Sequence, residues 1–311
     1  MSSYQQLNQD PLLTQAPVIG DFKVLPPCVI VEKLDEGAMG AVYRGYHYNL
    51  EIDVAIKCLK SELVARNREF LDRFQREAKL AAHITQENLV RVYDTLQQHG
   101  VFYTIMEFVD GENVQGRVQR KGPLSPQEAL SILLPATRAL AALHDRKIVH
   151  RDIKPPNIMV SQGGQVKLAD LGIAKSEEGF DNIRTHAQAV MGTPQYMAPE
   201  QFDSAANVND RADIYAIGAV LSFMLYGDHV VNGKSLEEIL KKVVVHGFPD
   251  MRGLLPQLSD DLYALIQRCT AARPADRPDA RTLVREMNQL LVAYGGGMSL
   301  ADPAAGRSPG P

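Results

Sequence analysis

Cysteine is scarce in this 311-residue sequence. Only Cys28, Cys58 and Cys269 occur, and they are odd in number, far apart and without a Cys-x-x-Cys pair. These features argue against a disulfide framework and against a zinc site built from cysteines. Because such a pattern is typical of a reducing compartment, we expect a cytoplasmic location.

A long hydrophobic run is also missing. The longest, residues 214–226, spans 13 residues and contains Ser222, whereas a transmembrane helix needs about 20. We therefore expect no membrane span in this chain, and a helix buried on all sides at 214–226. Residues 1–21 lack basic residues and a long apolar core, so they do not resemble a secretory signal. The chain is then either fully cytoplasmic or the cytoplasmic part of a longer membrane protein.

No excess of either charge is present. The sequence has 33 Lys and Arg against 37 Asp and Glu, a net charge of -4. We therefore expect no binding to nucleic acid. Hydrophobic residues make up 45% and charged residues 23%, as in soluble proteins with a sizeable core. The length suggests one large domain or two lobes that share a cleft.

The two ends of the chain differ in composition from its middle. Residues 1–26 are rich in Gln, Asn and Pro, and we predict a flexible leader there. Residues 295–311 are rich in Gly and Pro, which predicts a disordered tail or linker. The segment 27–294 is expected to fold.

Strand patterns precede helical patterns in this folded segment. Frequent β-branched and aromatic residues predict strands at 29–34, 41–48, 52–59, 89–96 and 101–108. One helix is predicted among them, at 62–83, and the chain becomes mostly helical after residue 111. Ser125 followed by Pro126 predicts a helix that runs to about residue 145, with a kink at Pro135. This order indicates an α+β fold.

The most informative segment is residues 150–157, His-Arg-Asp-Ile-Lys-Pro-Pro-Asn. It matches H-R-D-x-K-x-x-N, and a chance match at five fixed positions has odds on the order of 10⁻⁴ in a chain of this length. The spacing suits phosphoryl transfer, because Asp152 can accept the proton of a hydroxyl while Asn157 reaches a metal on the ATP phosphates. Lys154 lies between them and can reach the transferring group.

Further motifs occur in a fixed order around this segment: Val54-Ala55-Ile56-Lys57, Asp170-Leu171-Gly172, and Gly192-Thr193-Pro194-Gln195-Tyr196-Met197-Ala198-Pro199-Glu200. With them, the chain resembles the eukaryotic-like (Hanks-type) Ser/Thr protein kinases of bacteria over residues 28–292. The resemblance implies a bilobal protein-kinase fold, with a small β-rich N-lobe carrying one key helix at 27–106, a hinge at 107–111 and a larger helical C-lobe at 112–294. It also implies ATP and Mg²⁺, or Mn²⁺, as cofactors.

The resemblance assigns roles to individual residues. The catalytic residues are Asp152, Lys154 and Asn157, and the metal ligands are Asn157 and Asp170. The residues implied in ATP binding, with Glu77 holding Lys57 on the phosphates, are Leu34, Gly37, Gly40, Val42, Ala55, Lys57, Glu77, Met106, Glu107 and Val109. Three further residues are implied to be structural: Glu200 pairs with Arg277, and Asp213 anchors the catalytic loop.

The glycine-rich segment 34–43 departs from the family pattern at one position. Asp35 stands where the family usually has the first glycine of the loop. An aspartate there adds a negative charge near the nucleotide and gives a less permissive backbone.

The residue before Asp152 implies regulation. In this family an arginine such as Arg151 marks kinases that are tuned by phosphorylation of the activation loop, here residues 173–191. Thr185 lies eight residues before Thr193 and is the candidate autophosphorylation site, ahead of Ser176. Its phosphate could pair with Arg151 and order the loop. A homodimer would allow this phosphorylation to occur in trans.

Two other functions are compatible with the same fold. One is a catalytically weak pseudokinase that acts as a nucleotide-binding scaffold, and the other is a small-molecule kinase. Retention of five residues implied in catalysis or in ATP and metal binding argues against the first: Lys57, Glu77, Asp152, Asn157 and Asp170. The segment 192–200, which shapes a peptide-binding surface in the family, argues against the second. Proteins with Ser or Thr acceptors are therefore the expected substrates, in a signalling role.

Overall fold

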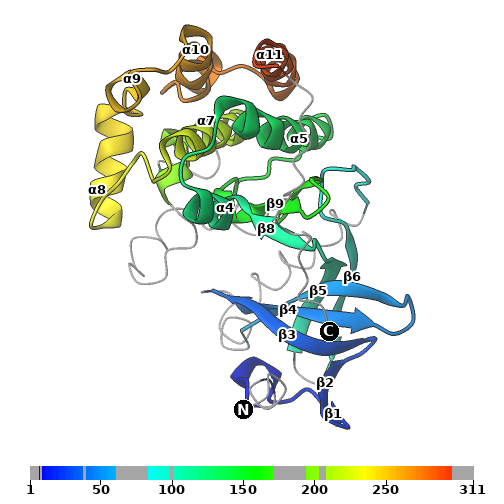
Figure 1. Cartoon of the computed structure of the whole chain (residues 1–311). Coiled ribbons are helices and arrows are strands. Elements are labelled where there is room, and N and C mark those ends of the chain that lie inside the picture. The colour runs from blue at the N-terminus through cyan, green and yellow to red at the C-terminus, as the bar shows by residue number, and fades with distance from the viewer. Residues whose placement is uncertain are drawn as a thin grey trace. The chain divides into compact units, whose positions relative to one another are not determined.

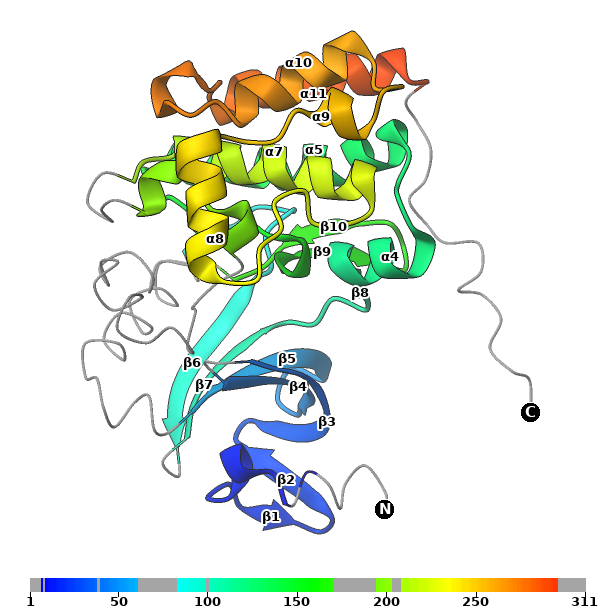
Figure 2. The same cartoon turned by 90° about the vertical axis from the view of Figure 1, so that its left-hand side faces the viewer.

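The structure is a computed structural model of the chain, and it describes residues 7, 9–37, 40–60, 83–98, 101–170, 194–202 and 208–295. The chain divides into two compact units. The first unit comprises residues 1–85 and 90–109, and the second comprises 86–89 and 110–311. The division between Val109 and Asp110 falls within the range that the sequence analysis gives to the hinge. The strands of the first unit are blue to cyan in Figure 1, and Figure 2 displays the helices of the second unit.

The first unit is built on a seven-stranded antiparallel sheet with the order β1-β2-β3-β4-β5-β7-β6. Its strands are β1 (Val18–Ile19), β2 (Phe22–Leu25), β3 (Cys28–Glu36), β4 (Gly40–His47), β5 (Ile52–Leu59), β6 (Val92–Gln98) and β7 (Val101–Glu107). The strands predicted at 29–34, 41–48, 52–59 and 101–108 are confirmed. The predicted strand at 89–96 begins later, at Val92, because Leu89 instead forms an isolated bridge with Leu168 in the second unit.

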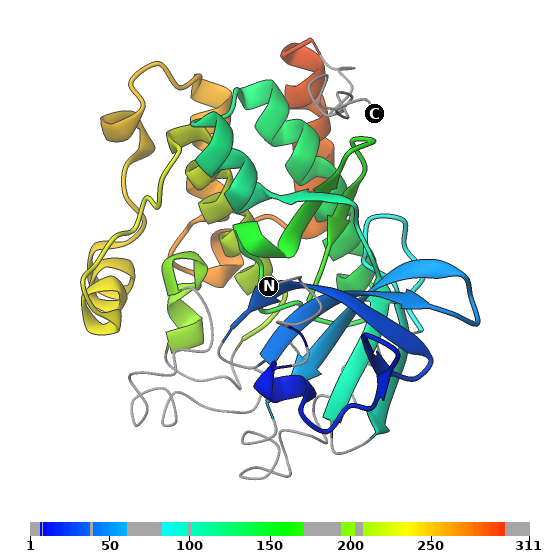
Figure 3. The same cartoon turned by 60° about the horizontal axis from the view of Figure 1, so that its bottom comes forward.

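The segment that precedes β3 differs from the flexible leader that its composition predicts. Residues 11–13 form a short 3₁₀ helix, η1 (Pro11–Leu13), and residues 18–25 form the β1–β2 hairpin at one edge of the sheet; this segment is dark blue in Figure 3. The side chains of Leu13 and Leu25 are fully buried, and Ala16 is almost so, in the same core as Ile30 and Tyr43. The burial of these few apolar residues in the core of the first unit therefore orders the segment, although its average composition is polar.

The helix predicted at 62–83 lies almost entirely outside the described residues, and Glu77 lies there too.

The second unit is mostly helical and carries a three-stranded sheet, with the order β10-β9-β8. The strands are β8 (Gly111–Asn113), β9 (Ile158–Ser161) and β10 (Val166–Leu168). The α-helices are α4 (Val114–Lys121), α5 (Pro126–His144), α7 (Arg211–Tyr226), α8 (Leu236–Lys241), α9 (Met251–Leu254), α10 (Asp260–Cys269) and α11 (Ala280–Ala293). Shorter helical turns are η2 (Pro155–Asn157), η4 (Pro194–Tyr196), η5 (Pro199–Phe202), η7 (Lys242–His246) and η8 (Pro274–Asp276).

The two central helices of this unit form where the sequence predicts them. Ser125 caps α5, since its hydroxyl accepts a hydrogen bond from the backbone N–H of Glu128 at 3.2 Å, and Pro135 lies inside the helix. Every residue of α7 from Ala212 to Leu225 is buried, which confirms the helix predicted at 214–226 to be buried on all sides. Within the described ranges, none of the helices combines the length and the apolar character needed to cross a membrane.

The three cysteines are all described, and each is a buried free thiol. The prediction that they form no disulfide is confirmed. Burial raises the pKa of each thiol, to about 12 for Cys28 and Cys269. These cysteines therefore act as small apolar core residues.

Candidate active site

The segment 150–157 is fixed to the start of α7 by one buried carboxylate. Asp213 is 1% exposed, and its two oxygens accept hydrogen bonds from the backbone N–H groups of His150 and Arg151, both at 2.8 Å. The Nε2 atom of His144, at the end of α5, lies 2.8 Å from the same carboxylate. Asp213 thus contacts the catalytic loop in the way that the resemblance implies.

The bonds to Asp213 support an unusual backbone conformation. Arg151 has a φ of 64°, in the left-handed region that residues with a side chain rarely adopt. Such a conformation costs about 1 kcal/mol or more and persists when surrounding contacts determine it. The hydrogen bond from the Arg151 N–H to Asp213 is one such contact, and it fixes the backbone immediately before Asp152.

Asp152 is oriented by the two other residues of the motif. Its Oδ2 atom lies 3.1 Å from the Nζ of Lys154 and 3.1 Å from the Nδ2 of Asn157. The same Nδ2 donates to the backbone carbonyl of Asp152 at 2.8 Å. The Asp152 side chain is 12% exposed. The structure therefore brings together Asp152, Lys154 and Asn157, and it fixes the carboxylate while leaving a small part of it accessible.

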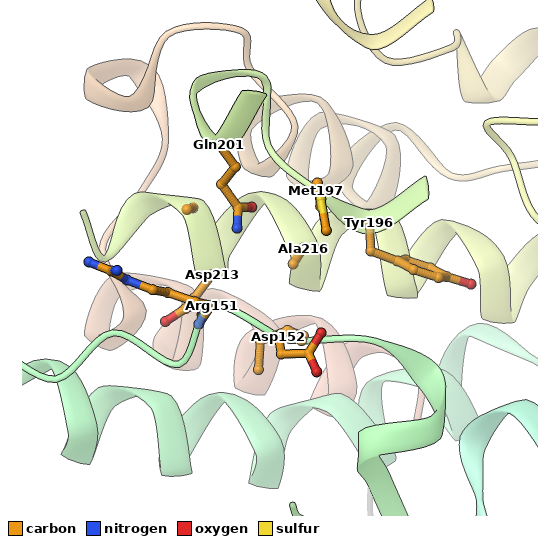
Figure 4. Close-up of a pocket in the computed structure, with 9 residues that line it drawn as sticks. Arg151, Asp152, Tyr196, Met197, Gln201, Asp213 and Ala216 are labelled. Carbon is orange, nitrogen blue, oxygen red and sulfur yellow. Dashed lines mark hydrogen bonds between the residues drawn. The ribbon is translucent and has the colours of Figure 1, made fainter. Parts of the chain in front are cut away.

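A small pocket lies beside Asp152 in the second unit. It holds about 260 Å³ of empty space, part of it open to solvent. Its lining residues come from the catalytic loop, the segment 194–202 and the start of α7: Arg151, Asp152, Ile153, Tyr196, Met197, Gln201, Ala212, Asp213 and Ala216. Figure 4 shows Tyr196 and Met197 on the opposite side of this pocket from Asp152. Asp152, the expected base, and the segment 194–202, which the resemblance links to peptide binding, therefore line the same pocket.

Asn157 and Asp170, the two residues implied as metal ligands, lie on two segments that are hydrogen-bonded to each other. The backbone carbonyl of Asn157 accepts a hydrogen bond from the N–H of Ala169 at 2.8 Å, directly before Asp170. An amide oxygen and a carboxylate are the oxygen ligands that Mg²⁺ prefers, and Mg²⁺ usually completes its shell with water and phosphate oxygens. Among the described residues no cluster of three or more His, Cys, Asp or Glu could hold a metal alone. The donor set therefore fits a metal that arrives with a phosphate ligand.

His150 is fully buried under the catalytic loop. Its Nε2 lies 3.1 Å from the carbonyl of Ala169, and its Nδ1 lies 3.3 Å from the backbone N–H of Asp152. Because a carbonyl only accepts and an amide N–H only donates, these partners select the neutral ring with its proton on Nε2. Burial lowers the pKa of His150, in agreement with a neutral ring.

The lowered pKa of His150 predicts a pH dependence of stability. Between the folded pKa and about 6.5, the ordinary value, the unfolded chain binds a proton that the folded chain does not. The free energy of unfolding therefore decreases as the pH falls through this window, by up to about 1.4 kcal/mol per pH unit from this histidine. Urea unfolding of the wild type and of His150→Phe at pH 7.5, 6.5 and 5.5 measures it. The variant should show a shallower slope than the wild type. An equal slope in His150→Phe would contradict the prediction.

A buried ion pair joins two distant segments of the second unit. The guanidinium of Arg277 forms two parallel hydrogen bonds to the carboxylate of Glu200, at 2.6 and 2.8 Å. The Arg277 side chain is 0% exposed and also donates to the carbonyls of Ala271, Ala272 and Arg211. Glu200 and Arg277 are thus the pair that the resemblance implies, and through it the segment 194–202 is connected to the loop between η8 and α11.

The residues implied in ATP binding that are described lie on the strands of the first unit, directly after β3, or just after β7. Lys57 on β5 lies opposite Val42 on β4 and Thr104 on β7, and Ala55 lies opposite Met106. Gly37 donates its backbone N–H to the carbonyl of Gly40 at 2.8 Å. A Cβ atom at Gly40 would lie 1.8 Å from the carbonyl oxygen of Cys58, whereas one at Gly37 would meet nothing within 4 Å. Close approach of β4 and β5 therefore requires the glycine at position 40.

Comparison with known proteins places these features in a family. The model of the protein kinase domain matches residues 28–287. The chain belongs to the protein kinase domain family. It is 34% identical over 248 residues to the serine/threonine-protein kinase PrkC of Bacillus subtilis, covering 80% of this chain and 38% of that protein. It is 36% identical over 250 residues to PknB of Mycobacterium tuberculosis, covering 79% of this chain and 40% of that protein.

A solved structure shows the same fold. The kinase domain of Mycobacterium tuberculosis PknI superposes with a TM-score of 0.69 at 26% identity, covering 88% of this chain and 99% of that chain. The predicted protein-kinase fold and the membership of the protein kinase family are therefore confirmed, and serine/threonine-protein kinases of bacteria are among the relatives. The kinase domain spans about two fifths of the length of PrkC and PknB.

Several of the predicted functional residues lie outside the described part of this kinase domain. They are Glu77, Ser176 and Thr185, so the Lys57–Glu77 pair and the phosphorylation site stay predictions. The structure adds two residues that the sequence analysis does not single out, His144 and Gln201. Gln201 accepts a hydrogen bond from the backbone N–H of Ala198 at 2.9 Å and lines the pocket. No sequence pattern indicates either residue, because each acts through a contact that only the folded backbone creates.

Proposed function

We propose that this kinase domain transfers the γ-phosphoryl group of ATP to Ser or Thr hydroxyl groups of proteins, in a signalling role. The observation that carries the proposal is the arrangement of Asp152, whose carboxylate contacts Lys154 and Asn157. Asp213 fixes the backbone that bears it. A base that must accept a proton at a defined point needs such an orientation.

In this mechanism the protein mainly positions reactants and neutralises charge, because the transition state of phosphoryl transfer is loose. Asp152 would orient the acceptor hydroxyl and accept its proton, while Lys154 would stabilise the transferring group. Asn157 and Asp170 would hold Mg²⁺ or Mn²⁺, which when bound neutralises charge on the phosphates. From the first unit, Lys57 would bind the phosphates. Leu34, Val42, Ala55, Met106, Glu107 and Val109 are the residues proposed to contact the nucleoside.

The direct test is incubation with γ-labelled ATP and Mg²⁺, with and without a generic basic protein as acceptor, beside Asp152→Asn. We expect label on Ser or Thr that disappears in the variant. Label on Tyr would contradict the acceptor class. ATP binding without any transfer would instead support the pseudokinase alternative.

We also propose autophosphorylation of Thr185 in a transient homodimer, with the domain located in the cytoplasm. Arg151 at the start of the catalytic loop is the cation that would bind the phosphate. Mass mapping of the incubated protein should find phosphate on Thr185, and the rate of autophosphorylation should rise with protein concentration if the reaction is in trans. Phosphate on other residues only, with an unaffected Thr185→Ala variant, would contradict this proposal.

The aspartate at position 35 predicts weakened nucleotide binding. Asp35 is exposed on β3, lies opposite Val42, and its Oδ1 accepts from the N–H of Glu36 at 2.8 Å. Because a carboxylate near the phosphates repels them, Asp35→Gly should lower the KM for ATP by about threefold to tenfold, an effect of roughly 1 kcal/mol. Asp35→Asn removes the charge without adding the backbone flexibility of glycine. It should therefore give most of the decrease in the KM for ATP if the charge is the cause. An unchanged KM in both variants would contradict the prediction.

A further inference from the structure

The segment 9–26 ends close to the strand that leads into the glycine-rich loop. Beyond its apolar contacts, it contributes one buried acid, Asp10, whose side chain is 5% exposed. The Oδ1 of Asp10 caps η1 by accepting the N–H of Leu12 at 3.0 Å. Its Oδ2 accepts a hydrogen bond from the Nζ of Lys33, on β3, at 2.8 Å. Asp10 therefore joins this segment to β3 by a charged contact as well as by packing.

The protonation of Asp10 agrees with this contact. Burial by itself would raise the pKa of its carboxyl, but the hydrogen bonds from Lys33 and from the N–H of Leu12 outweigh it and hold the pKa below its usual value. Asp10 is therefore a carboxylate at neutral pH, and the contact with Lys33 is an ion pair.

Lys33 also pairs with a second acid, Glu36, which lies next to the glycine-rich loop. Its Nζ also donates to Oε2 of Glu36 at 2.7 Å, and Oε1 of Glu36 lies 3.8 Å from the Nζ of Lys60, just past β5. Glu36 is the last residue of β3 and precedes Gly37 directly. The exposure of the side chains rises from 5% at Asp10 through 30% at Lys33 to 51% at Glu36. The series of ion pairs thus runs from a buried end to the exposed edge of the loop.

The pairing of β3 with β4 shows why such support matters. The register between these strands shifts twice, between Ile30 and Glu32 and between Lys33 and Asp35. A shift leaves the ladder locally disrupted and the strand bent. Beyond the second shift Asp35 and Glu36 still pair with β4, and the Asp10–Lys33–Glu36 series crosses that shift as an additional contact that supports the end of β3.

We propose that Asp10 is a positioning residue for nucleotide binding, which acts through Lys33 and Glu36 to fix the end of β3 beside the glycine-rich loop. This inference rests on the proposed function, since it assumes that the loop contacts ATP. It assigns to the segment before β3 a role in nucleotide affinity, in addition to its part in the core.

The experiment compares the wild type with Asp10→Asn, Lys33→Gln and the double variant in the full chain. Asparagine keeps the cap on η1 but removes the charge. We expect Asp10→Asn to raise the KM for ATP by about fivefold, with kcat changed less than about twofold, and Lys33→Gln to do the same or more. The double variant should be no worse than Lys33→Gln alone, because both changes break one series. The matched control is Asp21→Asn, an exposed acid in the β1–β2 turn, which should keep the wild-type KM.

Three results would overturn the inference. They are an unchanged KM in Asp10→Asn, a fall in kcat without a change in KM, and additive effects of the two substitutions. A lower melting temperature together with an unchanged KM would show a structural role only. A wild type that transfers no phosphate would contradict the proposed function instead. In that case calorimetric ATP affinity of the same variants tests the inference independently, and equal affinities would overturn it.

Discussion

Replacing Asp152 by asparagine is expected to lower kcat for phosphoryl transfer by about 10²- to 10⁴-fold, with little change in the affinity for ATP. Asparagine has the same shape and can keep one contact with Asn157, but its amide cannot accept the proton of an acceptor hydroxyl. The loss therefore falls on the chemical step. Initial rates at saturating ATP give kcat, and calorimetry gives the affinity.

The control for this variant is an acid of the same type placed away from the loop. Asp261, in the first turn of α10, is exposed, and Asp261→Asn should keep the wild-type kcat. The backbone bonds from His150 and Arg151 to Asp213 do not involve the Asp152 side chain, so the variant should unfold at nearly the wild-type temperature. A rate within tenfold of the wild type would show that another group accepts the proton.

Replacing Arg277 by alanine is expected to lower the free energy of unfolding by about 3–5 kcal/mol, which is a large share of the stability of a typical domain. The substitution leaves Glu200 as a mostly buried carboxylate without its partner, and it removes the donor to three backbone carbonyls. Urea unfolding of the two proteins, followed by circular dichroism, measures the difference.

Arg273 provides a matched control four residues earlier. It also pairs with an acid, Asp276, through two hydrogen bonds of 2.8 Å, but its side chain is 79% exposed. Water screens such a pair, so Arg273→Ala should change the unfolding midpoint very little. If Arg273→Ala and Arg277→Ala lost similar amounts of stability, the burial of the Glu200–Arg277 pair would not be the cause.

The local features of the site could be predicted from the sequence. The motif at 150–157 fixes residue types and spacing, so a short loop places Asp152, Lys154 and Asn157 near one another, although Asp213 on α7 holds the backbone of that loop. The cap at Ser125 and the mostly apolar run of α7 likewise depend on neighbouring residues. Contacts between distant residues were different: Glu200 and Arg277 are 77 residues apart, and only the resemblance to a family connected them.

The segment before β3 shows why composition failed as a guide. The average composition of this segment is polar, yet Leu13 and Leu25 are fully buried. Nothing in the sequence around Asp10 indicates that this acid is buried and pairs with Lys33, 23 residues later. Gln201 could not be predicted for a different reason, because its hydrogen bond with the N–H of Ala198 depends on the local backbone conformation and not on a residue pattern. The average composition of a segment does not indicate which of its side chains become buried against the rest of the protein.

The crowding at Gly40 changes how glycine-rich loops should be compared among relatives of this domain. The carbonyl of Cys58 excludes any side chain at position 40, so a descendant that had lost every contact with ATP would still need glycine there to pair β4 with β5. Selection for folding alone would preserve it. Gly37, around which a Cβ would meet open space, is under no such requirement. Among such relatives, loss of glycine at position 37 should therefore precede loss of glycine at position 40 once a kinase no longer binds a nucleotide.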